Sequence, residues 1–260
     1  MLKLIDSHCH LDAGEFAADR DAVYQRALDA GVQLHIIPAI SCANFAEVAA
    51  VCLRYEHCLP AWGMHPIYLD QHENTHLKAL RQQIERWRPV AIGEIGLDLF
   101  VPQLDFAQQE YFLVEQLKIA RDYDLPVLLH CRRANDQVLK HLRRLNITHG
   151  IAHAFSGSRQ QADAFIKQGF KLGFGGAFTW NRASNLRLLA KTLPLEAIVL
   201  ETDSPDMPPA WLDKAAGKVR NEPKEIAGIA ACLAALREIS LATLVDQTHT
   251  NVCNALNIKF

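Results

Sequence analysis

The sequence alternates short apolar runs with longer segments of helical period, and this alternation restricts the fold more than any other feature. The helical segments are recognised by apolar residues that recur every three or four positions, as in Ile226, Ile229 and Leu233. Because strands that alternate with helices form a parallel sheet, eight such units predict a closed (β/α)8 barrel. The eight apolar runs cover residues 2–5, 34–40, 59–64, 90–95, 127–129, 151–154, 170–174 and 197–200.

The intervening segments predict helices, and two of them begin with a capping signal. In both, a short polar residue stands three positions before a glutamine: Asp105 before Gln108, and Ser158 before Gln161. A doubly wound open sheet is the competing fold, but its first turn is usually rich in glycine, whereas this chain has Asp6-Ser7-His8 there. With no linker or low-complexity segment, residues 1–260 are expected to form one domain. The predicted helices cover residues 19–30, 43–55, 77–87, 105–123, 158–169 and 241–256, with others around Leu139, Leu189 and Leu233.

Composition restricts the classes of function. The net charge of -2 argues against bulk electrostatic attachment to nucleic acid or anionic lipid, although it leaves room for a phosphate-bearing substrate at a local site. The N-terminus lacks a signal-peptide pattern, and no apolar run approaches the ~18 residues that span a membrane. Seven cysteines, an odd number without a Cys-x-x-Cys pair, indicate a reducing, cytoplasmic setting. No obligate protein partner is evident.

Histidines and carboxylates directly follow several apolar runs, at the carboxyl ends of the predicted strands, where the active sites of such barrels lie. Imidazole and carboxylate ligands without thiolate suit Zn2+, Mn2+ or Mg2+, and Cys9 and Cys131 are expected to point to the opposite strand face. Six ligands exceed what one tetrahedral ion with an open position needs, and they match two ions that share a carboxylate. The candidates are His8, His10, His130 and His153, together with two or three carboxylates from the segments Gly93-Glu94-Ile95-Gly96-Leu97-Asp98 and Glu201-Thr202-Asp203.

Seven short motifs complete the pattern: Asp6-x-His8-x-His10, Gly63-Met64-His65-Pro66, Gly93-Glu94-Ile95-Gly96-Leu97-Asp98, His130-Cys131-Arg132, His153-Ala154-Phe155-Ser156-Gly157, Glu201-Thr202-Asp203-Ser204-Pro205 and Arg220-Asn221-Glu222-Pro223. With these motifs the chain resembles the TatD family of metal-dependent hydrolases, amidohydrolase-like barrels associated with deoxyribonuclease activity, chiefly on DNA ends. The resemblance implies that His8, His10 and Asp203 hold one ion. It further implies that His130 and His153 hold the second and that Glu94 bridges the two. The chain departs from the family pattern at Leu99-Phe100, where an aromatic pair is common, and at Ala154, where cysteine is usual.

The expected chemistry is hydrolysis of a phosphoester, with DNA ends or single-stranded DNA as the candidate substrate. A hydroxide activated between two ions would attack phosphorus, with Glu94 and Asp203 as the catalytic carboxylates. Asp203 would orient the water and accept its proton, unless it is purely a ligand. Glu201 is expected to orient a ligating histidine rather than to bind metal.

Four further residues are candidates for substrate binding, and two of them have a plainer alternative. Arg132 either grips a phosphate or pairs with a surface carboxylate. His65 either contacts substrate or caps its loop. Arg220 and Asn221 stand near the start of the last-but-one helix, where backbone N–H groups favour a phosphate.

Two other functions remain open at this point. Related barrels hydrolyse C–N bonds in cyclic amides or nucleobases, but their two-metal members typically carry a lysine at the end of strand four, where this chain has Glu94. A non-catalytic metal-binding scaffold is the alternative from a different class.

Overall fold

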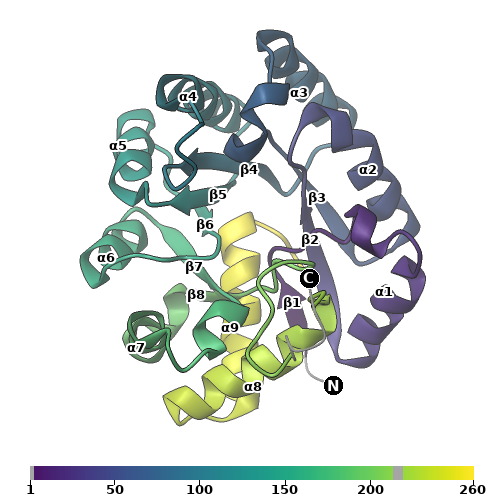
Figure 1. The fold of residues 1–260 in the computed structure, drawn as a ribbon, viewed down its shortest axis with the longest axis vertical. Helices are drawn as coiled ribbons and strands as arrows, with labels where there is room; N and C mark the ends of the chain where they lie inside the picture. Colours follow the sequence, from purple (N-terminus) through teal and green to yellow (C-terminus); the bar gives the residue numbers. More distant parts are fainter. Residues whose placement is uncertain (1–2, 213–218) are drawn as a thin grey trace.

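A computed structural model describes residues 3–212 and 219–260 and contains a single parallel sheet of eight strands in sequence order. The sheet curls around a central axis with the helices outside it (Figure 1), so the predicted (β/α)8 barrel is confirmed. The strands are β1 (Leu4–Asp6), β2 (Val32–Pro38), β3 (Cys58–Trp62), β4 (Ala91–Asp98), β5 (Val127–Arg132), β6 (Gly150–Ala152), β7 (Phe170–Phe174) and β8 (Ile198–Leu200).

The helices follow the predicted segments closely. The Asp105 side chain accepts a hydrogen bond from the Gln108 N–H, and Ser158 forms a reciprocal capping box with Gln161, so both predicted caps are present. The segment predicted to start at Asn221 begins with a short 3-10 turn, η6 (Pro223–Glu225), before the α-helix proper. The α-helices are α1 (Arg20–Asp29), α2 (Phe45–Arg54), α3 (Asn74–Arg86), α4 (Phe106–Asp122), α5 (Asn135–Leu145), α6 (Arg159–Lys167), α7 (Ser184–Thr192), α8 (Ile226–Arg237) and α9 (Leu241–Leu256).

Side-chain and backbone hydrogen bonds join the first and last strands. The Ser7 N–H and hydroxyl both donate to the Leu200 carbonyl, at 3.0 and 2.9 Å. The buried Asp6 carboxylate accepts from the Thr202 N–H at 2.9 Å and from its hydroxyl at 2.6 Å. These bonds hold the segment after β1 beside the segment after β8, and both segments carry predicted metal ligands.

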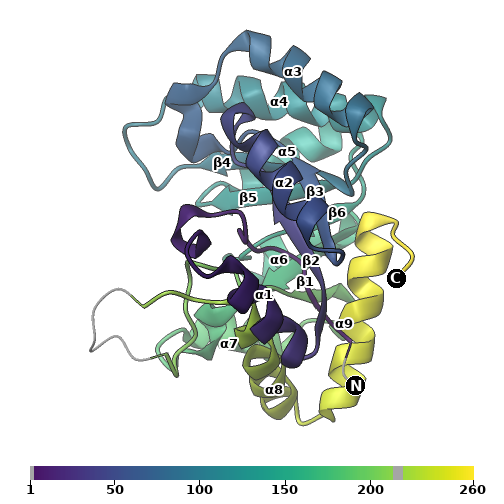
Figure 2. The same cartoon turned by 90° about the vertical axis from the view of Figure 1, so that its right-hand side faces the viewer.

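Helix α9 closes one end of the barrel. Its Val252 and Leu256 pack with apolar side chains from the barrel interior, among them Leu34 and Ile151. The Asn251 amide donates to carbonyls at the start of β8, including that of Ile198 at 2.7 Å. Figures 1 and 2 together show α9, in yellow, across this end, and the candidate ligands follow the carboxyl ends of the strands at the opposite end.

Within residues 3–212 and 219–260, no single helix is long and apolar enough to cross a membrane. The segments Pro223–Arg237 and Leu241–Leu256 pass only as a pair, by length and composition, and the pair is bent by 113°.

Candidate metal centre

Glu94 lies at the centre of the predicted ligands, on β4, with its side chain 3% exposed. A Cβ at Gly93 would lie 2.5 Å from Leu128 Cβ, so glycine at that position allows β4 to approach β5 closely just before Glu94. One carboxylate oxygen, Oε2, lies 3.1 Å from His8 Nε2 and 3.8 Å from His10 Nε2. This oxygen therefore faces the two histidines that follow β1.

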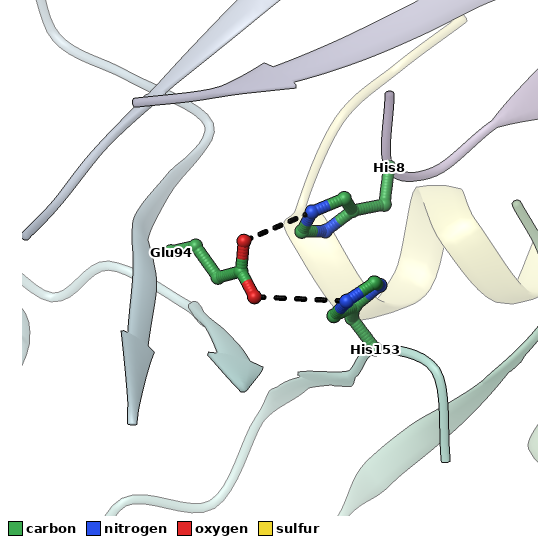
Figure 3. Close-up of side chains that lie close together, drawn as sticks. All are labelled: His8, Glu94 and His153. Atoms are coloured by element: carbon green, nitrogen blue, oxygen red, sulfur yellow. Dashed lines mark ion pairs between the residues drawn. The ribbon is translucent and has the colours of Figure 1, made fainter. Parts of the chain in front are cut away.

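The other oxygen of Glu94, Oε1, faces a different set of imidazoles. It lies 3.1 Å from His130 Nδ1, 3.2 Å from His65 Nε2 and 3.6 Å from His153 Nε2. Figure 3 shows His8 and His153 on the same side of the Glu94 carboxylate, with one oxygen directed to each ring. The two rings stack with their centroids 3.7 Å apart, and His8, Glu94 and His153 form a further group able to hold a cation. Both oxygens of Glu94 therefore face imidazole nitrogens.

Asp203 completes the group around the first oxygen. Its Oδ1 lies 3.8 Å from both His8 Nε2 and His10 Nε2, and potential ligand atoms of the three residues fall within 4.8 Å of one another. The Asp203 N–H donates to the His8 carbonyl at 2.9 Å, which ties the segment after β8 to the segment after β1. The structure therefore brings together the three residues that the resemblance places on one ion.

His65 has a larger part in the centre than the sequence suggested. Its Nδ1 accepts a hydrogen bond from the Ile67 N–H at 3.1 Å, so it caps the short helix η3 (Pro66–Gln71). At the same time its Nε2 points to Glu94, and His65, Glu94 and His130 form one of the groups able to hold a cation. Nδ1 of His65 thus caps η3, and this hydrogen bond orients the ring so that Nε2 faces Glu94.

Two buried carboxylates orient the histidines from outside. Glu201 Oε1 lies 3.2 Å from His153 Nδ1 and accepts from the Ala154 N–H, as expected of a residue that orients a ligand. A Cβ at Gly173 would lie 2.1 Å from Glu201 Oε2, so only glycine leaves room for this carboxylate. Asp98 Oδ2 lies 3.0 Å from His130 Nε2. The resemblance to the TatD family assigned Asp98 no role, although Asp98 ends the Gly-Glu-Ile-Gly-Leu-Asp motif.

Burial and neighbouring charge set the protonation of these groups. Burial lowers the pKa of His8 to about 3 and that of His65 to about 4, so both rings are neutral. His8 therefore offers a ring nitrogen with a lone pair as a ligand. Burial also raises the pKa of Asp203 to about 6. Burial likewise disfavours protonation of His153, but the charges of Glu201, Asp203 and Glu94 raise its pKa to about 10. The negative charges of these carboxylates therefore favour a positive charge in their midst, and the protonated His153 ring provides one.

A divalent ion fits this environment better than a proton does. Both ring nitrogens of His8 and Oε2 of Glu201 are buried without a hydrogen-bond partner. Buried carboxylates are costly unless a cation compensates them, and neutral imidazoles supply the lone pairs that a cation needs. Oxygen and nitrogen donors in this mixture suit zinc, manganese or magnesium.

The remaining predicted site residues lie in different environments. Arg132 is half exposed at the end of β5, with its Nη1 3.8 Å from Asp98 Oδ2. Arg220 donates to both oxygens of Asp19, at 2.7 and 2.8 Å, and its side chain is committed to this pair. Asn221 is fully buried, and its amide donates to carbonyls of the chain after β8, including Thr202 O at 2.9 Å. Arg220 and Asn221 therefore hold protein segments together.

The structure has known relatives in sequence and in fold. A family model described as TatD related DNase matches residues 5–257. The "uncharacterized metal-dependent hydrolase YjjV" of Escherichia coli K12 is 44% identical over 257 residues, covering 95% of this chain and 97% of that protein. The "3'-5' ssDNA/RNA exonuclease TatD" of Escherichia fergusonii is 30% identical over 263 residues, covering 99% and 100% of the two chains.

Solved structures agree with these matches. The crystal structure of Escherichia coli YjjV superposes with a TM-score of 0.93 at 41% identity, covering 98% of each chain. A TatD family hydrolase from Entamoeba histolytica has a TM-score of 0.87 at 24% identity, again over 98% of each chain, and supports the fold alone. With the family model covering nearly the whole chain and a relative of 44% identity, this chain belongs to the TatD family of metal-dependent hydrolases.

Proposed function

We propose that this enzyme is a phosphodiesterase that removes nucleotides from the ends of single-stranded DNA, using two divalent ions. One observation carries the proposal: Glu94 Oε2 lies 3.1 Å from His8 and Oε1 lies 3.1 Å from His130, and the groups His8–His10–Asp203 and His65–Glu94–His130 each have potential ligand atoms within 4.8 Å of one another. Paired ions are a recurrent solution for displacement at phosphorus. The name of the Escherichia fergusonii relative, at 30% identity, supports nucleic acid as the substrate.

His8, His10 and Asp203 would hold one ion, and His130 and His153 the other, with Glu94 shared. When bound, such ions supply a nucleophilic water at neutral pH and take up charge on phosphoryl oxygens. Zinc, manganese and magnesium all remain in the proposal, because the donors suit each.

Asp203 is the carboxylate placed to handle the proton of the attacking water. Its side chain is 17% exposed, whereas that of Glu94 is 3% exposed. Asp203 is therefore the more accessible of the two from solvent at the carboxyl ends of the strands, which we call the mouth of the barrel. The Asp203 N–H donates to the His8 carbonyl, which holds the backbone of Asp203 beside that of His8. We therefore assign proton acceptance to the Asp203 carboxylate and a shared, purely ligating role to Glu94.

The residues proposed to bind substrate lie at the same end of the barrel, where the carboxyl ends of the strands surround the metal centre. Arg132 is exposed beside the centre and keeps donors for a phosphate, and His65 is held by its loop cap facing the ligands. Arg220 and Asn221 are now proposed to hold the loops in place, since their donors are used within the protein. The cytoplasm is the proposed location, because the seven cysteines lie within the described residues and are all free.

The test is an assay of metal-replete enzyme on four substrates: a single-stranded oligonucleotide, closed circular DNA, bis(p-nitrophenyl) phosphate and a cyclic amide such as hydantoin. Cleavage of the oligonucleotide with little activity on closed circles, and a weak salt dependence, is the expected result. Asp203→Asn should abolish this activity, whereas Asp163→Asn, on the outer face of α6, should not. Turnover of the cyclic amide alone would make the enzyme a C–N hydrolase and overturn the proposal.

A further inference from the structure

One exposed aromatic ring and two arginines form a cluster at the carboxyl ends of β4 and β5. The guanidinium carbon of Arg132 lies 3.7 Å from the centre of the Phe100 ring, and that of Arg133 lies 4.7 Å from it. Phe100 is 45% exposed, and the Arg132 side chain is 48% exposed. These three residues are called the rim cluster below.

Asp98 connects the rim cluster to the metal centre. Its Oδ1 accepts hydrogen bonds from the backbone N–H groups of Phe100 at 2.8 Å and Val101 at 3.1 Å, which fixes the loop that carries the ring. Its Oδ2 lies 3.0 Å from His130 Nε2 and 3.8 Å from Arg132 Nη1. The rim cluster is therefore adjacent to a predicted ligand, but a carboxylate stands between them.

The arginines of the rim cluster keep their donors available. A guanidinium stacked on a ring uses its flat face, and its N–H groups point outward in its own plane. The 3.8 Å separation of Arg132 from Asp98 is too long for a hydrogen bond. Among residues 3–212 and 219–260, no carboxylate lies within ion-pair distance of exposed Arg133. Two positive charges thus face solvent at the rim of a chain whose net charge is -2.

We infer that the rim cluster binds the phosphate next to the one being hydrolysed, through the guanidinium groups of Arg132 and Arg133. This rests on the proposed function, since it supposes that a phosphodiester is cleaved at the metal centre. Asp98 separates Arg132 from the ligands, so the guanidinium is placed to contact a neighbouring phosphate rather than the scissile one. Phe100 is a positioning residue, because its ring holds the two guanidinium groups in place.

The experiment measures binding of a fluorescent, phosphorothioate-linked oligothymidylate to metal-replete enzyme by anisotropy over a range of salt concentrations. Arg132→Ala and Arg133→Ala should each reduce the slope of log affinity against log salt by about 0.7, the value for one contact with a single-stranded phosphate. Phe100→Leu should weaken binding several-fold and leave the slope unchanged, because the ring carries no charge. Phe100→Tyr, which keeps an aromatic ring, should restore the affinity.

Arg81→Ala is the matched control, because Arg81 also lies over an aromatic ring, that of Tyr123, but on the outer helix α3. Its salt slope should equal that of the wild type. Rim variants that behave like Arg81→Ala would overturn the inference, even if the enzyme degrades DNA efficiently. Reduced slopes in an enzyme that hydrolyses no nucleic acid would support the rim cluster and refute the proposed reaction, so the two failures are distinguishable.

Discussion

Replacing Gly173 by alanine perturbs the metal centre without touching a ligand. The added methyl group would lie 2.1 Å from Glu201 Oε2 and 2.6 Å from Glu201 Cδ. Since non-bonded atoms rest ~3.5–4.0 Å apart, the carboxylate must retreat by about 1 Å or more. That movement breaks its contacts with His153 Nδ1 at 3.2 Å and with the Ala154 N–H at 2.6 Å.

Two magnitudes follow from this displacement. Overpacking of a buried site costs ~1–3 kcal/mol of unfolding free energy. Loss of the group that orients a ligating histidine lowers metal affinity roughly 10–100-fold. Chelator competition would measure the affinity and urea titration the stability, with Gly14→Ala as the control, because a Cβ at Gly14 has nothing within 4 Å.

A double variant separates the clash from the lost contact. Gly173→Ala combined with Glu201→Ala removes the carboxylate that the methyl group strikes, so part of the stability should return. Metal affinity should stay low, because His153 still lacks its partner. If Gly173→Ala alone binds metal and resists urea as the wild type does, Glu201 is not confined as described and the reasoning is wrong.

Three further predictions concern the ligands and one buried histidine. Glu94→Gln should reduce metal affinity far more than Glu201→Gln, because an amide is a poor bridge between cations; equal losses in chelator competition would reverse the two assignments. Elemental analysis should find about two ions per chain, with roughly one lost in each of His8→Ala and His130→Ala; unchanged metal content in both variants would refute the two-ion site. Burial lowers the pKa of His35 from 6.5 to about 4, so its contribution to stability is complete above pH 6.5 and is lost as the pH falls towards 4. The loss amounts to up to about 3 kcal/mol. Urea titrations of His35→Leu should therefore show a shallower loss across that range, and parallel curves would exclude His35 as the source.

Much of the fold could be predicted from the sequence because the apolar spacing within each strand and helix is a local signal. The final helix occupies Leu241–Leu256 and the seventh strand Phe170–Phe174, both as predicted, since apolar spacing defines them without distant partners. The candidate ligands stand at strand ends, which a parallel barrel brings to one face, whereas the resemblance to the TatD family selected the six among them.

The rest depends on contacts between residues far apart in the chain. Nothing near Arg220 indicates that Asp19 will take its donors, and nothing near His130 indicates that Asp98 will face it. His65 shows the same limit in another way: its cap on η3 is a local signal, but its approach to Glu94 depends on how β3 and β4 pack. Sequence patterns therefore indicate which residues reach the mouth and leave open which of them meet.

The closed end of the barrel has a practical consequence for handling the enzyme. His249 on α9 lies with Nδ1 3.1 Å from the Lys3 carbonyl and Nε2 3.4 Å from the Phe260 carbonyl, so one side chain touches both ends of the described chain. Figure 2 shows Phe260 and the first described residues of the chain beside α9, away from the loops at the carboxyl ends of the strands. An affinity tag, a fluorophore or a surface linker joined to either terminus would leave the mouth facing solution. A short peptide joining the termini would circularise the chain without crossing the entrance to the metal centre.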